Sequence, residues 1–85
     1  METFLLELGA GFSFIARRKR IQFDGDDFYI DLLFHNRKLK RLVVVELKQG
    51  AFKPEYKGQM ALYLRWLAKY ETAAGEETPL GYHTR

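Results

Sequence analysis

Three ionisable side chains interrupt two apolar stretches of this sequence at a spacing that could bind a cation. Residues 27–34 carry Asp31, and residues 42–48 carry Glu46 and Lys48. Side chains two residues apart on a strand share a face, so Glu46 and Lys48 should lie beside each other. An acid within an apolar strand needs a partner, because burying an uncompensated charge costs free energy.

An antiparallel hairpin would bring the two acids together. If its turn is centred between Lys38 and Leu39, Asp31 lies opposite Glu46. Opposed residues share a face, with their Cβ atoms about 4.5–5.5 Å apart. Two facing carboxylates repel each other unless a cation lies between them, and a hard divalent ion with oxygen ligands is the usual partner. A turn shifted by one residue would send one carboxylate to the other face.

An exposed hairpin is the alternative, with Asp31, Glu46 and Lys48 forming an ordinary ion-pair cluster on its wet face. Three successive valines, Val43, Val44 and Val45, instead indicate a strand that is buried on both faces. In the first stretch, strict alternation predicts that one face carries Phe28, Ile30, Leu32 and Phe34.

The order of these residues resembles a known signature. Asp31, followed by Glu46-Leu47-Lys48 at the end of an apolar strand, resembles the D…(D/E)xK pattern of the PD-(D/E)xK nuclease superfamily. The surrounding stretches resemble its YhcG-type branch, namely FLLELGAGFSF, DFYIDLLF and LVVVELKQGAFKPEYKGQM. The resemblance covers most of the chain. It implies an α/β (α+β) restriction-endonuclease-like fold, an αβββαβ core in which helices flank a mixed sheet with a central antiparallel hairpin.

The resemblance also implies a chemistry for these residues. Asp31, Glu46 and the backbone carbonyl of Leu47 would bind Mg²⁺ or Mn²⁺, and Lys48 would hold the attacking water. The expected function is therefore metal-dependent hydrolysis of phosphodiester bonds in DNA, with RNA as the less favoured substrate. The alternative is a catalytically inactive nuclease-fold module that binds nucleic acid or mediates assembly.

Two helical stretches add further candidates. In residues 1–8, Glu7 is either a solvated helix residue or, as the resemblance implies, an acid that faces the metal. Residues 54–70 have helical spacing and begin with a proline, which suits a first helical turn. Gln59 and Tyr63 lie four residues apart on one face of this helix. They resemble a QxxxY motif that reaches toward the active site and the nucleic-acid backbone, although Tyr63 also fits the core and Gln59 its edge.

A run of cations lies nearer the N-terminus: Arg17, Arg18, Lys19 and Arg20. Such a run is most often a solvated surface at a sheet edge or loop. Contact with nucleic-acid phosphates is the functional alternative, and each contact would increase the salt sensitivity of binding. His35 lies far along its strand from Asp31, so a structural or solvent-exposed role is expected for it.

Size and composition limit the remaining possibilities. The 85 residues are expected to form a single domain, 1–85, with a small core that oligomerisation would stabilise. A hydrophobic content of 47% argues against disorder, and a net charge of +3 suits a polyanionic partner. Without cysteine, disulfides and thiolate metal sites are excluded. No stretch is long enough to span a bilayer, so a cytoplasmic protein with no membrane partner is expected.

The C-terminal stretch, residues 79–85, is short and polar where members of the family continue with an apolar strand. A final strand that is stunted or missing is therefore expected. The sheet edge left open could be covered by a second copy, which predicts a homodimer. Relatives also carry an N-terminal DNA-binding domain, which is expected to be absent here.

Overall fold

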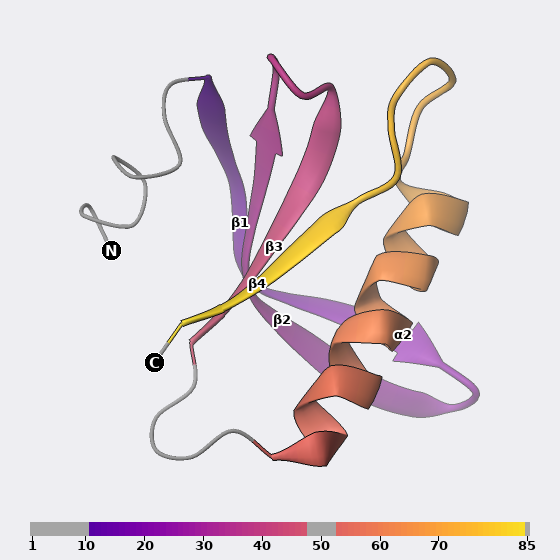
Figure 1. Cartoon of the computed structure of the whole chain (residues 1–85). Helices are drawn as coiled ribbons and strands as arrows, with labels where there is room; N and C mark the ends of the chain where they lie inside the picture. The colour runs from indigo at the N-terminus through magenta and orange to yellow at the C-terminus, as the bar shows by residue number, and fades with distance from the viewer. Residues whose placement is uncertain (1–10, 48–52, 85) are drawn as a thin grey trace.

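The computed structural model describes residues 11–47 and 53–84, which form a four-stranded sheet and one long helix (Figure 1). In chain order these are β1 (Phe12–Phe23), β2 (Asp26–Asn36), β3 (Arg41–Leu47), α2 (Pro54–Tyr70) and β4 (Leu80–Thr84). The strand order is β1-β2-β3-β4, with β4 parallel to β3 and the other pairs antiparallel. The mixed sheet with a central antiparallel hairpin is confirmed. The first helix of the expected core lies outside the described residues.

None of the described helices is long and apolar enough to cross a membrane.

Turn chemistry sets the first hairpin. Asp24 and Gly25 form the two-residue loop between β1 and β2, with φ angles of 55° and 84°. A type I′ turn needs positive φ at both central residues, and Asp-Gly is one of the few dipeptides that tolerate it. The turn therefore joins two long strands in a fixed register.

The second hairpin has the register that the sequence predicts. Leu32 pairs with Val45 and Asn36 with Arg41, which centres the turn where it was expected. Asn36 is buried, and its side-chain oxygen accepts a hydrogen bond from the backbone N–H of Leu39 at 2.9 Å. Because this bond closes the turn, a slip of the strands by one residue would break it.

Apolar side chains pack on both faces of the sheet. Val44 belongs to the core beneath α2, whereas Val43 and Val45 belong to the core on the opposite face. All three are fully buried, as their succession in the sequence predicts. Burying each such side chain contributes roughly 1.5–3 kcal/mol relative to leaving it exposed. Strand β3 is therefore held from both sides.

Strand β2 departs from strict alternation, so the predicted common face of its four apolar residues was wrong. Ile30 packs beneath α2 together with Leu33, whereas Leu32 packs on the opposite face. On β1, Arg18 falls between the paired residues at this level and has a left-handed φ of 53°. Both strands change direction near their middle (Figure 1). Local irregularities of this kind bend a strand and increase its twist, and this one falls at Asp31.

The final strand is present as β4, with five residues, so it is short as expected but it is not missing. All five of its residues pair in parallel with β3, from Leu80 opposite Val43 to Thr84 opposite Leu47. Tyr82 packs against the core on the face away from α2. Backbone pairing with a buried neighbour thus forms a strand from a short, polar sequence.

A close approach between α2 and β4 makes Gly81 necessary. A Cβ atom at this position would lie 2.8 Å from Cγ of Met60 and closer still to its sulfur. We expect Gly81→Ala to lower the free energy of unfolding by about 1–3 kcal/mol, because Met60 is buried and must shift. Urea denaturation would measure the loss.

Gly58→Ala is the matched control. Gly58 lies inside α2, and a Cβ there meets nothing within 4 Å. Alanine favours helix over glycine by up to about 1 kcal/mol, so this variant should be more stable than the wild type. Similar effects of the two substitutions would contradict the close packing of α2 on β4.

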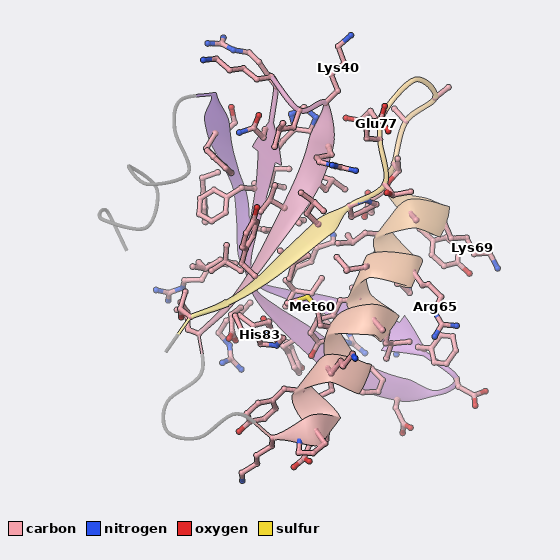
Figure 2. All side chains as sticks on the ribbon, in the orientation of Figure 1. Lys40, Met60, Arg65, Lys69, Glu77 and His83 are labelled. Carbon is pink, nitrogen blue, oxygen red and sulfur yellow. The ribbon has the colours of Figure 1, made fainter. Side chains whose placement is uncertain are left out.

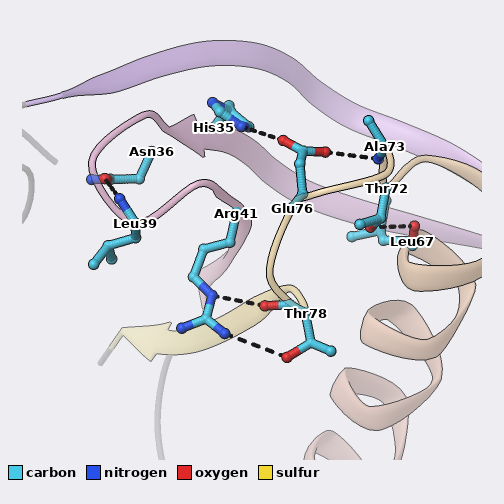
Figure 3. A network of polar contacts seen from close by, with 9 residues as sticks. All are labelled: His35, Asn36, Leu39, Arg41, Leu67, Thr72, Ala73, Glu76 and Thr78. Atoms are coloured by element: carbon cyan, nitrogen blue, oxygen red, sulfur yellow. Dashed lines mark hydrogen bonds and ion pairs between the residues drawn. The ribbon is translucent and has the colours of Figure 1, made fainter.

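Polar contacts dock the connection between α2 and β4 onto the β2–β3 hairpin (Figure 3). Nε2 of His35 lies 2.6 Å from Oε2 of Glu76, and the other carboxylate oxygen accepts the backbone N–H of Ala73 at 2.8 Å. Nε of Arg41 donates to the carbonyl of Thr78, also at 2.8 Å. His35 therefore has a structural contact rather than a place near Asp31.

The same network predicts acid sensitivity. The Ala73 N–H, and secondly His35, hold the pKa of Glu76 below its usual range. A lowered folded-state pKa stabilises the fold above the unfolded value, and this stability is lost as the pH falls through the folded value. We therefore expect the melting temperature of the wild type to fall more between about pH 5 and 3 than that of Glu76→Gln. Parallel melting curves across this range would argue against the contribution of Glu76.

Candidate active site

Asp31 and Glu46 meet where β2 and β3 stop pairing. The last backbone pair before them is Leu32 with Val45. Beyond it, the Asp31 N–H donates to Oε2 of Glu46, and the Leu47 N–H donates to Oδ2 of Asp31, each at 2.8 Å. Each carboxylate thus takes the place of a backbone carbonyl in the ladder. These reciprocal hydrogen bonds hold the two acids across from each other, in the predicted register.

Both carboxylates lie on the side of the sheet that α2 covers. Leu33 and Val44 are two residues from Asp31 and Glu46, respectively, and both pack beneath α2. Burial, followed by the negative charges of Glu46 and Asp31, raises the pKa of Tyr63 on α2 to about 12. The reciprocal hydrogen bonds hold the two acids together, and the pairing of β2 with β3 has the predicted register. A turn slipped by one residue is ruled out.

The burial of Glu46 argues against an ordinary surface ion pair. Its side chain is 1% exposed, although it lies next to Leu47, which is 50% exposed. Taking an ionised carboxylate out of water costs several kcal/mol unless opposite charge and hydrogen bonds compensate. The pair therefore lies at the edge of the core, one residue from solvent.

His83 of β4 is a neighbour of the acidic pair that sequence reasoning missed. It stands opposite Glu46 in the parallel register, and its ring stacks on Tyr56 of α2 with centroids 6.4 Å apart. The only sequence signal was the short stretch after Pro79, which was expected to form little or no strand. Placing β4 beside β3 brings this imidazole to the site.

The donor set suits a hard divalent cation. Each carboxylate offers about four lone-pair positions, so one hydrogen bond does not exhaust it. Mg²⁺ keeps several waters and recruits substrate phosphates, so two protein carboxylates can suffice. Within residues 11–47 and 53–84, no three His, Cys, Asp or Glu side chains group together to hold a metal. Two further predicted participants, Glu7 and Lys48, lie outside the described residues.

Tyr63 belongs to the core and also borders the acids. It is 4% exposed and packs edge-on against Phe28, with ring centroids 6.4 Å apart. The phenol is protonated at neutral pH, as the ordinary pKa of tyrosine near 10 already requires, and the raised pKa favours this form further, so it can donate a hydrogen bond. Gln59, one turn earlier on α2, is half-buried.

Three of the four cations on β1 have partners within the protein. The partners are the Tyr29 ring for Arg18, the Glu71 carboxylate for Lys19 and the Asp27 carboxylate for Arg20. The hydrogen bond from Arg20 lowers the pKa of Asp27. Arg17 is exposed. A nucleic-acid phosphate would have to compete with these contacts.

A mixed sheet that carries an acidic pair on its central hairpin, beneath a helix, is the arrangement expected of a nuclease domain of the PD-(D/E)xK class. The chain belongs to the YhcG PDDEXK nuclease domain family, whose model matches residues 1–82. It is also 41% identical over 78 residues to the protein named "Putative nuclease YhcG" of Escherichia coli (strain K12).

That alignment covers 92% of this chain and 21% of the relative, so the chain spans about a fifth of the length of this relative. No solved structure matches. The family match establishes that the chain is a nuclease-family domain, and the mixed sheet with its helix agrees with an α+β restriction-endonuclease-like fold. Nucleases of this class typically use divalent metals.

Proposed function

We propose that this chain is a single catalytic domain, residues 1–85, of a metal-dependent nuclease that hydrolyses phosphodiester bonds in DNA. One observation carries the proposal. Two carboxylates on one face of the sheet are held by reciprocal hydrogen bonds, beside a buried phenol that both charges affect. A bound divalent cation would compensate these two negative charges and could in turn bind a substrate phosphate.

In this proposal Asp31, Glu46 and the carbonyl of Leu47 hold Mg²⁺ or Mn²⁺, and Glu7 faces the same ion. When bound, the cation stabilises the charge that develops on the phosphate. Lys48 orients the attacking water and offsets negative charge, because its ammonium group is stabilised by the two acids.

Side chains from α2 complete the site on the substrate side. The protonated phenol of Tyr63 donates a hydrogen bond to a phosphate oxygen of the nucleic acid, and Gln59 is a catalytic residue that reaches toward the active site. We also assign phosphate contacts to the four cations of β1: Arg17, Arg18, Lys19 and Arg20. The net charge of +3 favours a polyanionic substrate, and we propose DNA rather than RNA.

The sheet edge supports a proposal about assembly. In the part of the chain that the structure describes, β4 is the last strand of the sheet. An edge strand offers unpaired backbone groups to another strand. We propose that two copies of the chain pair along this edge.

A cleavage assay tests the proposed function. Supercoiled plasmid and an RNA of matched length are incubated with the protein in Mg²⁺, in Mn²⁺ or in excess chelator. We expect DNA cleavage with either ion and none with chelator. Folded protein that binds DNA in a salt-dependent manner, yet cuts under none of these conditions, would instead identify an inactive nucleic-acid-binding module.

A further inference from the structure

A second feature lies away from the acidic pair, on another flank of α2. A groove of about 670 Å³ separates the C-terminal half of α2 from the far end of the β1–β2 hairpin. The residues on which the following inference depends are Phe23, Asp24, Arg65, Trp66, Lys69 and Tyr70. We call this the hairpin groove.

Aromatic rings form the wall of the hairpin groove. Phe23 is 51% exposed and Tyr70 is 60% exposed, and both line the same groove, so they form a contiguous patch rather than isolated exposed rings. Trp66 also lines the groove, and its Nε1–H donates a hydrogen bond to the carbonyl of Gln22 at 3.1 Å. The Trp66 and Tyr70 rings lie 5.0 Å apart between centroids. The groove thus presents a rigid aromatic surface to solvent.

Cations surround these rings. Arg65 and Lys69 project from the same side of α2 (Figure 2), and Nζ of Lys69 lies 5.3 Å from the centre of the Tyr70 ring. Nζ of Lys19 on β1 lies 5.8 Å from the Trp66 ring. Lys19 is paired with the Glu71 carboxylate, but among the lining residues the two cations Arg65 and Lys69 outnumber the one acid, Asp24. The rim therefore favours a negatively charged ligand.

We propose that the hairpin groove binds unpaired bases of a single-stranded nucleic acid. The bases stack on Phe23, Trp66 and Tyr70, and the neighbouring phosphates contact Arg65 and Lys69. Aromatic platforms within a cationic groove fit a flexible strand whose bases are free to stack, and they do so without regard to sequence. A base pair within a duplex cannot offer its face to these rings, because its neighbours already cover it.

The position of the groove gives this binding a consequence for the substrate. Gln22, whose carbonyl holds Trp66, pairs with Asp27 on β2. Asp27 is four residues from Asp31, which corresponds to about 13 Å along a strand. A strand held in the groove can therefore reach the acidic pair within a few nucleotides. The inference rests on the proposed function only in taking nucleic acid as the ligand, and it selects DNA with a single-stranded segment beside the cut.

Trp66 is the only tryptophan in the chain, so its fluorescence reports directly on the groove. The Glu46→Gln protein, kept in chelator to prevent cutting, is titrated with short oligothymidine and with a blunt duplex of equal length. We expect saturable quenching by the single strand and much weaker binding of the duplex. Tyr70→Ala and Phe23→Ala should each weaken single-strand binding about tenfold or more.

Two further variants separate stacking from charge. Lys69→Gln should weaken binding and lower the salt slope by about one, because one phosphate contact is lost. Tyr29→Ala is the matched control. The Tyr29 ring, on β2, is 44% exposed, but it lies beneath the Arg18 side chain of β1 and does not line the groove. Its affinity should equal that of the parent protein.

The proposal is overturned if quenching does not saturate, if duplex and single strand bind equally, or if Tyr29→Ala weakens binding as much as Tyr70→Ala. Fluorescence that changes with protein concentration alone would place a second copy of the chain in the groove instead. The nuclease function is judged by wild-type cleavage. Cutting without quenching refutes only the groove, and quenching without cutting refutes only the catalytic role.

Discussion

Replacing Glu46 by glutamine is expected to reduce metal-dependent DNA cleavage by at least about a hundredfold while leaving the fold intact. Glutamine keeps an oxygen that can accept the Asp31 N–H, and it nearly matches glutamate in volume, so the ladder between β2 and β3 survives. It removes the charge that would hold a cation. Initial rates on plasmid at saturating Mg²⁺ would measure the loss, with circular dichroism as the test of folding.

Glu77→Gln is the matched control for this experiment. Glu77 is exposed in the connection before β4. Its backbone N–H, rather than its carboxylate, donates a hydrogen bond to the carbonyl of Lys40 at 2.8 Å. Figure 2 shows Glu77 and Lys40 at the end of the molecule that carries the β2–β3 turn and the connection before β4. This variant should cut at the wild-type rate. Equal rates for the two glutamine variants would remove Glu46 from the mechanism.

Tyr63 should show the largest effect on stability. Tyr63→Ala removes a ring that is 4% exposed and should lower the free energy of unfolding by about 3–5 kcal/mol. Tyr63→Phe keeps the ring, so it should remain within about 1.5 kcal/mol of the wild type. The phenylalanine variant should nevertheless cut about tenfold more slowly, because a hydrogen bond from the phenol to a charged phosphate is lost. Chemical denaturation and cleavage rates on the same preparations would separate the two effects.

Tyr70→Ala is the control for stability, since Tyr70 on the same helix is 60% exposed and should change the free energy of unfolding by less than about 0.5 kcal/mol. If Tyr63→Phe cuts at the wild-type rate, Tyr63 is a core residue only. If Tyr63→Ala is as stable as the wild type, the packing of α2 on the sheet has been misassigned.

The central hairpin could be predicted because its determinants are local. The polar turn and the apolar stretches on both sides set the register, and this register places Asp31 opposite Glu46. The three valines indicate burial on both faces without reference to any other part of the chain. Helix α2 could be predicted equally well, because the proline at its start and its helical periodicity lie within its own sequence.

Other features depend on contacts between distant segments, and sequence periodicity carries little signal for them. The change of face in β2 falls at the level of Arg18 on β1, whose left-handed φ no periodicity signals. Strand β4 forms because β3 offers it a buried partner, and this pairing places His83 opposite Glu46. The hairpin groove likewise exists because the β1–β2 turn brings Phe23 to α2.

Calorimetric titration of Mn²⁺ and Mg²⁺ into the wild type, Glu46→Gln and Asp31→Asn tests the central claim most directly, because it measures cation binding without requiring turnover. The account predicts saturable binding to the wild type and a loss of affinity of at least about tenfold in both variants. Identical affinity in all three proteins, or no binding to folded wild type, would show that Asp31 and Glu46 do not form a metal site.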